Sequence, residues 1–300
     1  MSAELERTKV KSEPERKGAS RRSGLASGSL ANTPATHRAT EATLEISGPA
    51  RIPEPIPFNG LLTNTVLASL PGSEFKELLP YVEPVSLVAG QELYGFQQHA
   101  DFTYFPETAV ISHLFLLEDG STSGSSIVGS EGMIGLSAIF GSGPPAYRSQ
   151  VIVGGTALRI RAEVIKQEFV RGRGLQQLLL RHISARLAQL AQKAICNGRH
   201  RVQERLCTWL LMIRDRASEE QLPLTQEQIA QHLGARRPGI TAYCKALRDN
   251  GIISYHRGLI RILDRPTLEA SACECYRALA SIDRAWSSSP GHVAAERGSQ

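Results

Sequence analysis

The sequence has no apolar run close to the ~18 residues that a membrane-spanning helix needs. Its first residues also have no apolar core of the kind found in secretory signal peptides. We therefore expect a cytoplasmic protein without a membrane partner.

Metal-ligating residues are also scarce. There are five cysteines in 300 residues, and none precedes Cys196. Cys273 and Cys275 are closer in sequence than the usual zinc-binding pair, and no second Cys/His pair accompanies them. There is no His-x-His motif and no evident third ligand near His99 or His113, which argues against a cupin-type metal oxygenase. We expect small buried thiols, no bound metal and no cofactor.

Charge is divided unevenly along the chain. The net charge is +5, but residues 58–170 hold five basic and eleven acidic side chains, whereas residues 199–265 hold twelve basic and seven acidic ones. A chain of this length can form two domains with separate cores. The charge division suits one domain that avoids polyanions and another that binds them.

The pattern of the first two-thirds of the chain predicts a disordered tail and then a β domain. Residues 1–55 carry too few large apolar side chains to offset the entropy of ordering. Over residues 56–170, short helices give way to short apolar runs that Gly-rich and acidic turns separate. Such a pattern is typical of a closed antiparallel β structure.

The chain becomes helical from Ala162 onward, with a long helix expected over residues 171–197. Apolar residues recur there at steps of three and four, which leaves two interpretations. The helix belongs to the core of its own domain, or it forms a dimer seam. We favour the seam because the helix lies between two predicted domains and carries polar residues on its other side. The residues of this predicted seam are Leu175, Leu179, Ile183, Leu187, Leu190 and Ala194.

Residues 198–283 predict a winged helix-turn-helix, followed by a disordered tail over residues 284–300. Thr225 and Gln228 form a capping box for one helix, and Gly234 permits a sharp turn. Pro238 suits the first turn of a second helix, which precedes two short β runs.

The second helix has a basic outer face, which fits the major groove of double-stranded DNA. An ordinary solvated helix could carry the same basic charge. It would not be expected together with a capped first helix, a glycine turn and a wing. The predicted DNA-binding residues are Thr225, Arg236, Arg237, Gly239, Thr241, Lys245, Arg248 and Arg257.

This order of elements resembles the Crp/Fnr family of bacterial transcription regulators over about residues 58–280. The resemblance is most specific from Leu224 to Ile253 and moderately specific in Glu131–Leu136 and Leu268–Tyr276. It implies an α+β chain with a cyclic-nucleotide-binding-like antiparallel β-roll, a dimerisation helix and a C-terminal winged helix-turn-helix. It also implies a homodimer that binds a palindromic operator and contacts RNA polymerase.

The resemblance assigns roles to single residues. Arg237 occupies the position of a base-contacting arginine, and Lys245 and Thr225 occupy phosphate-contacting positions. Members of the catabolite-activator type have a glutamate and a second arginine where this chain has Pro238 and Ala242. We therefore expect a different operator.

The sensing domain also departs from the family pattern. Gly135, Arg148 and Ser149 match residues that hold cyclic AMP, but Leu136 replaces the glutamate that binds the ribose. Losing a charged hydrogen bond costs on the order of 1.5–3 kcal/mol, so we do not expect cyclic AMP to be the signal. The four-cysteine iron–sulfur cluster of other members is not expected either, because no cysteine lies in the sensing domain.

Three functions follow from these patterns. The first is a regulator that responds to an unidentified signal sensed by the β-roll. The second is a constitutive DNA-binding protein whose β-roll serves only for dimerisation or partner docking. The third, a cupin-like metalloenzyme, is the remotest, and we expect no enzyme activity.

Overall fold

The computed structural model describes residues 62–141 and 143–288. The predicted tail over residues 1–55 lies outside this range, as does the part of the predicted C-terminal tail beyond Ser288. The first five residues of that predicted tail, 284–288, instead continue the last helix, α10 (Cys275–Ser288). The prediction of a tail is wrong there because Trp286 is buried and its indole Nε1 donates to the carbonyl oxygen of Glu131.

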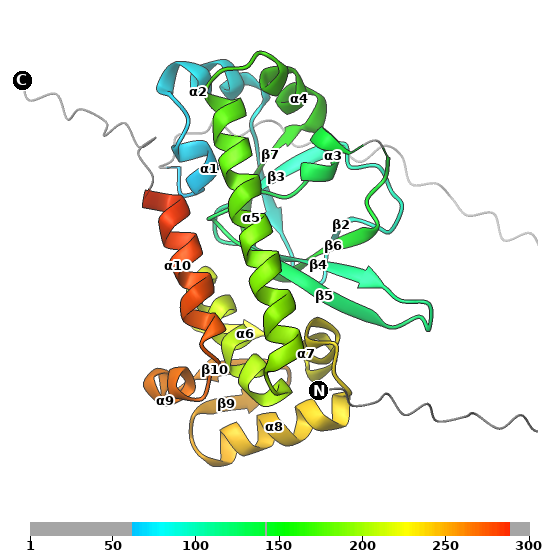
Figure 1. The fold of residues 1–300 in the computed structure, drawn as a ribbon, viewed down its shortest axis with the longest axis vertical. Coiled ribbons are helices and arrows are strands. Elements are labelled where there is room, and N and C mark those ends of the chain that lie inside the picture. Colours follow the sequence, from blue (N-terminus) through cyan, green and yellow to red (C-terminus); the bar gives the residue numbers. More distant parts are fainter. Residues whose placement is uncertain (1–61, 142, 289–300) are drawn as a thin grey trace, which may run out of the picture. The chain divides into compact units, whose positions relative to one another are not determined.

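The first domain is an antiparallel β-roll, as predicted (Figure 1). One sheet has the strand order β1-β7-β3 and the other β2-β6-β4-β5. Alternate side chains of both sheets form a shared apolar core that includes Ile111, Val128 and Val151. The elements are α1 (Thr65–Ala68), α2 (Gly72–Leu78), η1 (Leu79–Tyr81), β1 (Glu83–Leu87), β2 (Glu92–Tyr94), β3 (Phe102–Pro106), β4 (Val110–Leu116), β5 (Thr122–Val128), α3 (Leu136–Phe140), β6 (Tyr147–Val153) and β7 (Gly155–Arg161).

Helix α4 (Ala162–Val170) leads into the long helix α5 (Gly174–Arg199). The carboxylate of Glu74 accepts hydrogen bonds from the backbone N–H groups of Gly174 and Leu175, which satisfies two free donors at the start of α5. In Figure 1, α5 runs beside the β-roll, with α10 alongside it.

Two residues of the predicted dimer seam lie in the core of the β-roll domain instead. Leu175 and Leu179 are 2% and 0% exposed and pack with Phe105 and Ile165. That part of the seam prediction is wrong because the first two turns of α5 cover the β-roll. Further along α5 the apolar stripe reaches the surface, where Leu187 is 62% exposed.

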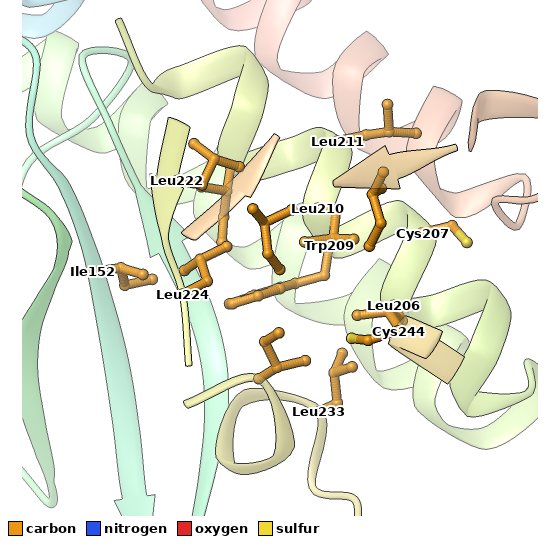
Figure 2. Packing of buried hydrophobic residues seen from close by; sticks show 14 of the residues in the cluster. Ile152, Leu206, Cys207, Trp209, Leu210, Leu211, Leu222, Leu224, Leu233 and Cys244 are labelled. Atoms are coloured by element: carbon orange, nitrogen blue, oxygen red, sulfur yellow. The ribbon is translucent and has the colours of Figure 1, made fainter. Parts of the chain in front are cut away.

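The second domain is a winged helix-turn-helix, also as predicted. Its helices pack around Trp209 and Leu210, which α6 contributes (Figure 2). Its elements are α6 (Val202–Arg216), β8 (Gln221–Pro223), α7 (Gln226–Leu233), α8 (Arg237–Asp249), β9 (Ile253–His256), β10 (Leu259–Ile262) and α9 (Arg265–Ala270). The strands form one antiparallel sheet in the order β8-β10-β9.

Candidate nucleic-acid interface and sensor cavity

The turn between α7 and α8 is built by local sequence. The Thr225 hydroxyl accepts from the backbone N–H of Gln228, and the Gln228 carboxamide oxygen accepts from the backbone N–H of Thr225. This capping box starts α7 at a defined residue. Gly234 ends α7 with φ +57°, a conformation that glycine adopts with little strain.

Helix α8 is held by its apolar face. Ile240, Cys244 and Leu247 are almost completely buried against α6 and α7. Figure 2 shows Cys244 beside Leu206, with Leu233 of α7 nearby. Because these contacts fix the rotation of α8 about its axis, they also decide which side chains face solvent.

The predicted DNA-binding side chains lie on the opposite, outer surface. The exposed residues are Thr225, Arg236, Arg237, Thr241, Lys245, Arg248 and Arg257, whereas Gly239 is half-buried. Arg257 lies in the turn of the β9–β10 wing, where its φ is +47°.

The cations on this surface have only weak competing partners. Arg237 Nε lies 3.9 Å from Glu227 Oε2, and Arg248 Nη2 lies 3.1 Å from Asp249 Oδ1. Both pairs are solvent-exposed, and exposed pairs contribute about 0.2–1 kcal/mol. These arginines can therefore exchange their carboxylate partners for phosphates or base edges at little cost.

Gln226 is a member of this surface that the sequence analysis missed. Its Oε1 accepts a hydrogen bond of 2.6 Å from Thr241 Oγ1, which joins the first residue of α7 to the outer face of α8. The sequence feature that could have indicated Gln226 is its position directly after Thr225, the N-cap of α7.

A cavity of about 180 Å³ lies in the β-roll against α5. Gly135 lies in its wall with φ +106°, and a Cβ there would come within 3.1 Å of the Phe102 carbonyl oxygen. The lining residues are His113, Phe115, Ser125, Ser126, Met133, Gly135, Leu136, Tyr147, Arg186 and Leu190.

Among the described residues that line this cavity, Arg186 is the only charged side chain, and the sequence alone did not indicate it. It projects from α5 and is 9% exposed. Its Nη1 donates to the Ile127 carbonyl oxygen at 3.3 Å and to Gln189 Oε1 at 2.5 Å. Burial, together with the nearby charge of Arg186, lowers the pKa of His113 to about 3, so His113 is neutral at physiological pH.

Comparison with known proteins agrees with this architecture. Residues 204–271 match the family model of the Crp-like helix-turn-helix domain. This match spans α6 to α9, so the C-terminal domain is similar to Crp-like helix-turn-helix domains. None of the curated protein sequences matches it.

Solved Crp/Fnr structures share its fold. A structure from Eubacterium rectale, described as a transcriptional regulator of this family, is 19% identical, with a TM-score of 0.56 over 67% of this chain and 94% of that chain. The CRP-family regulator TTHB099 of Thermus thermophilus is 17% identical, with a TM-score of 0.54 over 63% and 96%. FixK2 of Bradyrhizobium japonicum is 18% identical, with a TM-score of 0.51 over 64% and 98%.

The three predicted ligand residues do not line one cavity. Arg148 and Ser149 follow each other in strand β6, so their side chains point to opposite faces. Arg148 Nη1 lies 3.8 Å from Glu92 Oε2, in a hollow that Arg236 and Arg237 also line. Ser149 is buried, with its Oγ 2.9 Å from His113 Nδ1. The structure therefore places only Gly135 in the cavity against α5.

A buried ion network connects the two domains. Arg216 of α6 donates from Nε to Glu131 Oε1 at 2.7 Å and from Nη2 to Asp283 Oδ2 at 2.5 Å. Burial raises the pKa of Glu131, but the charge and hydrogen bond of Arg216 and the charge of Arg186 together outweigh burial and hold that pKa below its usual value. A loop of the β-roll is thus tied to α6 and α10 by charged hydrogen bonds.

Proposed function

We propose that the chain binds double-stranded DNA as a homodimer, with α8 in the major groove, and controls transcription in response to a signal sensed by the β-roll. The observation that carries the proposal is the division of α8 into a buried apolar face and an exposed basic face. Arg237 lies at the first turn of α8 and would donate two hydrogen bonds to a guanine. Lys245 and the wing residue Arg257 would neutralise phosphates.

The exposed part of α5 supports the homodimer. Leu180 and Leu187 are 54% and 62% exposed, although both are large and apolar. Together with three further residues they recur at alternating steps of three and four, which is the period of a two-helix seam. We propose this corrected seam, which omits the buried Leu175 and Leu179: Leu180, Ile183, Leu187, Leu190 and Ala194.

The cavity against α5 supports a signal-responsive regulator over a constitutive DNA-binding protein. A pocket of about 180 Å³ is below the ~300–1,000 Å³ typical of drug-sized ligands, so we propose a small ligand, and not cyclic AMP. The cation of Arg186 favours a ligand with an anionic or hydrogen-bond-accepting group. Since Leu190 of the seam also lines the cavity, occupancy would alter how two α5 helices meet.

Strand β5 also contacts α7 directly. A Cβ added at Gly124 would overlap the side chain of His232, so the sensor hairpin and the helix-turn-helix are closely packed. A ligand that moves this hairpin would shift the population of DNA-competent dimers.

The residues do not support a metalloenzyme of the cupin type. His99 and His113 line different cavities among the described residues, so they do not converge on one ion. None of the helices among the described residues combines the length and the apolar character that a membrane span requires. We propose a cytoplasmic regulator with RNA polymerase as a further partner.

Selection of DNA sites from a random pool tests the proposal. We expect a two-fold symmetric motif with half-sites about 10 bp apart, as for other dimeric helix-turn-helix proteins. Pro238 and Ala242 have no side-chain group that can hydrogen-bond to a base at the two positions where catabolite-activator-type members have glutamate and arginine. The motif should therefore differ from the catabolite-activator operator. Enrichment of no motif, together with equal affinity for random DNA at moderate salt, would reject the proposal.

A further inference from the structure

Four metal-ligating side chains gather between the end of α5 and the start of α10. They are Cys196, His200, Cys273 and Cys275, and their ligand atoms all lie within 4.8 Å of one another. Among the residues that the structure describes, this is the only group of three or more His, Cys, Asp or Glu side chains close enough to hold one ion. The three cysteines are buried and none forms a disulfide.

The fold brings together two short motifs that are about 75 residues apart. Cys196 and His200 lie one turn apart at the end of α5, and Cys273 and Cys275 flank Glu274 at the start of α10. Figure 1 shows α5 and α10 side by side. From the sequence we expected thiols without a metal, because Cys273 and Cys275 have no second Cys/His pair near them in the chain. The sequence does not show that Cys196 and His200 face them in the fold.

The distances fit one tetrahedral ion. Cys196 Sγ lies 3.6 Å from Cys273 Sγ, and Cys275 Sγ lies 3.5 Å from His200 Nδ1. Zinc bonds of ~2.3 Å to sulfur and ~2.0–2.1 Å to nitrogen, at tetrahedral angles, place two sulfurs about 3.8 Å apart and a sulfur and a nitrogen about 3.5 Å apart. An iron–sulfur cluster contains several ions and would hold its ligands farther apart.

The surrounding groups are those of a metal site. Glu274 Oε2 lies 3.1 Å from His200 Nε2, so the carboxylate can accept the proton of that nitrogen and leave Nδ1 free as a ligand. Gln192 Nε2 donates to Cys275 Sγ at 3.1 Å, and Thr208 Oγ1 lies 3.1 Å from Cys273 Sγ. Both contacts suit thiolates that accept hydrogen bonds.

Two cations also lie near such a site. Three thiolates, one neutral histidine and Zn²⁺ carry a net charge of −1. Lys193 and Arg205 interact electrostatically with the cysteines of the group. The charges around the site are therefore of the sign that a zinc–thiolate centre needs.

We propose that Cys196, His200, Cys273 and Cys275 bind one structural zinc ion. Four protein ligands close the coordination sphere and leave no open position for a substrate, as in structural zinc sites. The ion would join the end of α5 to the start of α10, and thereby fix the long helix to the DNA-binding domain. Zinc binding does not depend on the proposed DNA-binding function and is tested separately from it.

Metal analysis of the full-length protein, purified with reductant and without chelator, tests the site. We expect about one zinc per chain, lost in Cys273→Ser and in His200→Gln. Cys207→Ser and Cys244→Ser are matched controls, because both residues are buried cysteines outside the group, and these variants should keep the zinc. Cobalt in place of zinc should give the visible absorption of a tetrahedral thiolate site.

Glu274→Gln tests the site without disturbing the core, because the Glu274 side chain is 80% exposed. Loss of an outer-shell partner of this kind typically weakens metal affinity about 10- to 100-fold. We expect that loss in a chelator competition assay, with an unchanged circular dichroism spectrum. Protein that purifies without zinc, iron with inorganic sulfide in its place, or equal zinc content in Cys273→Ser would each overturn the proposal.

Discussion

Leu187 provides a quantitative test of the proposed α5 seam. Burying a whole leucine side chain is worth ~1.5–3 kcal/mol. Since Leu187 is 62% exposed in the protomer, its burial in a seam would contribute on the order of 1–2 kcal/mol per chain. Leu187→Ala keeps the Cβ atom, so it should cost about 1 kcal/mol per chain, or about 2 kcal/mol per two-fold dimer. That cost weakens dimerisation about 30-fold.

Leu187→Glu should have a larger effect, because it places two carboxylates in an apolar seam. Analytical ultracentrifugation over a range of protein concentrations measures both variants. Val170→Glu is the control, since Val170 is 76% exposed but lies in α4, outside the seam. The seam is refuted if Leu187→Glu dimerises as tightly as the unchanged protein. If the seam exists, Leu187→Glu should also lose binding to DNA sites that require two half-sites.

Three further predictions concern the buried charges and the metal site. Arg216→Ala leaves Glu131 as a buried charge without its main partner, so urea denaturation should show a free energy of unfolding lower by about 3–5 kcal/mol; a loss below about 1 kcal/mol would contradict this. Burial lowers the folded-state pKa of His113, His182 and His232 to about 3. The free energy of unfolding should therefore be greatest above about pH 6.5. Below that pH it should fall by about 1.4 kcal/mol per pH unit for each histidine. Denaturation at about pH 7 and pH 5.5 measures this fall, and a flat profile would contradict it. A zinc chelator should lower the Tm of the unchanged protein but not that of Cys273→Ser, and equal shifts in both would count against the metal site.

The features predicted best from sequence depend on neighbouring residues. The Thr225–Gln228 capping box and the turn at Gly234 are local, and the structure contains both. The apolar stripe of α8 is likewise encoded within four turns of one helix. Most strands of the β-roll coincide with the short apolar runs, because an inward face must be apolar wherever two sheets pack. Strand β2 has three residues, which is too short for an apolar pattern to be recognised in the sequence.

The features predicted poorly depend on distant parts of the chain. The apolar stripe of α5 faces the β-roll at Leu175 and solvent at Leu187, and only the folded domain shows where the change occurs. Arg148 and Ser149 were grouped because they adjoin in sequence, but neighbouring residues of a strand face opposite ways. Likewise, Cys196 and Cys273 are 77 residues apart, and their proximity follows from the packing of α10 on α5.

The central claim is that the outer face of α8 binds DNA, and charge-removing variants test it most directly. Fluorescence anisotropy with a selected DNA site would compare Arg237→Ala and Lys245→Ala with the control Lys166→Ala, which removes an exposed cation from α4. Arg237→Ala should cost about 1–3 kcal/mol, or about 5- to 150-fold in affinity, and relax specificity at one base pair. Lys245→Ala should weaken all sequences alike and reduce the salt dependence by about one phosphate contact. Unchanged affinity in both α8 variants, or an equal loss in Lys166→Ala, would contradict the claim.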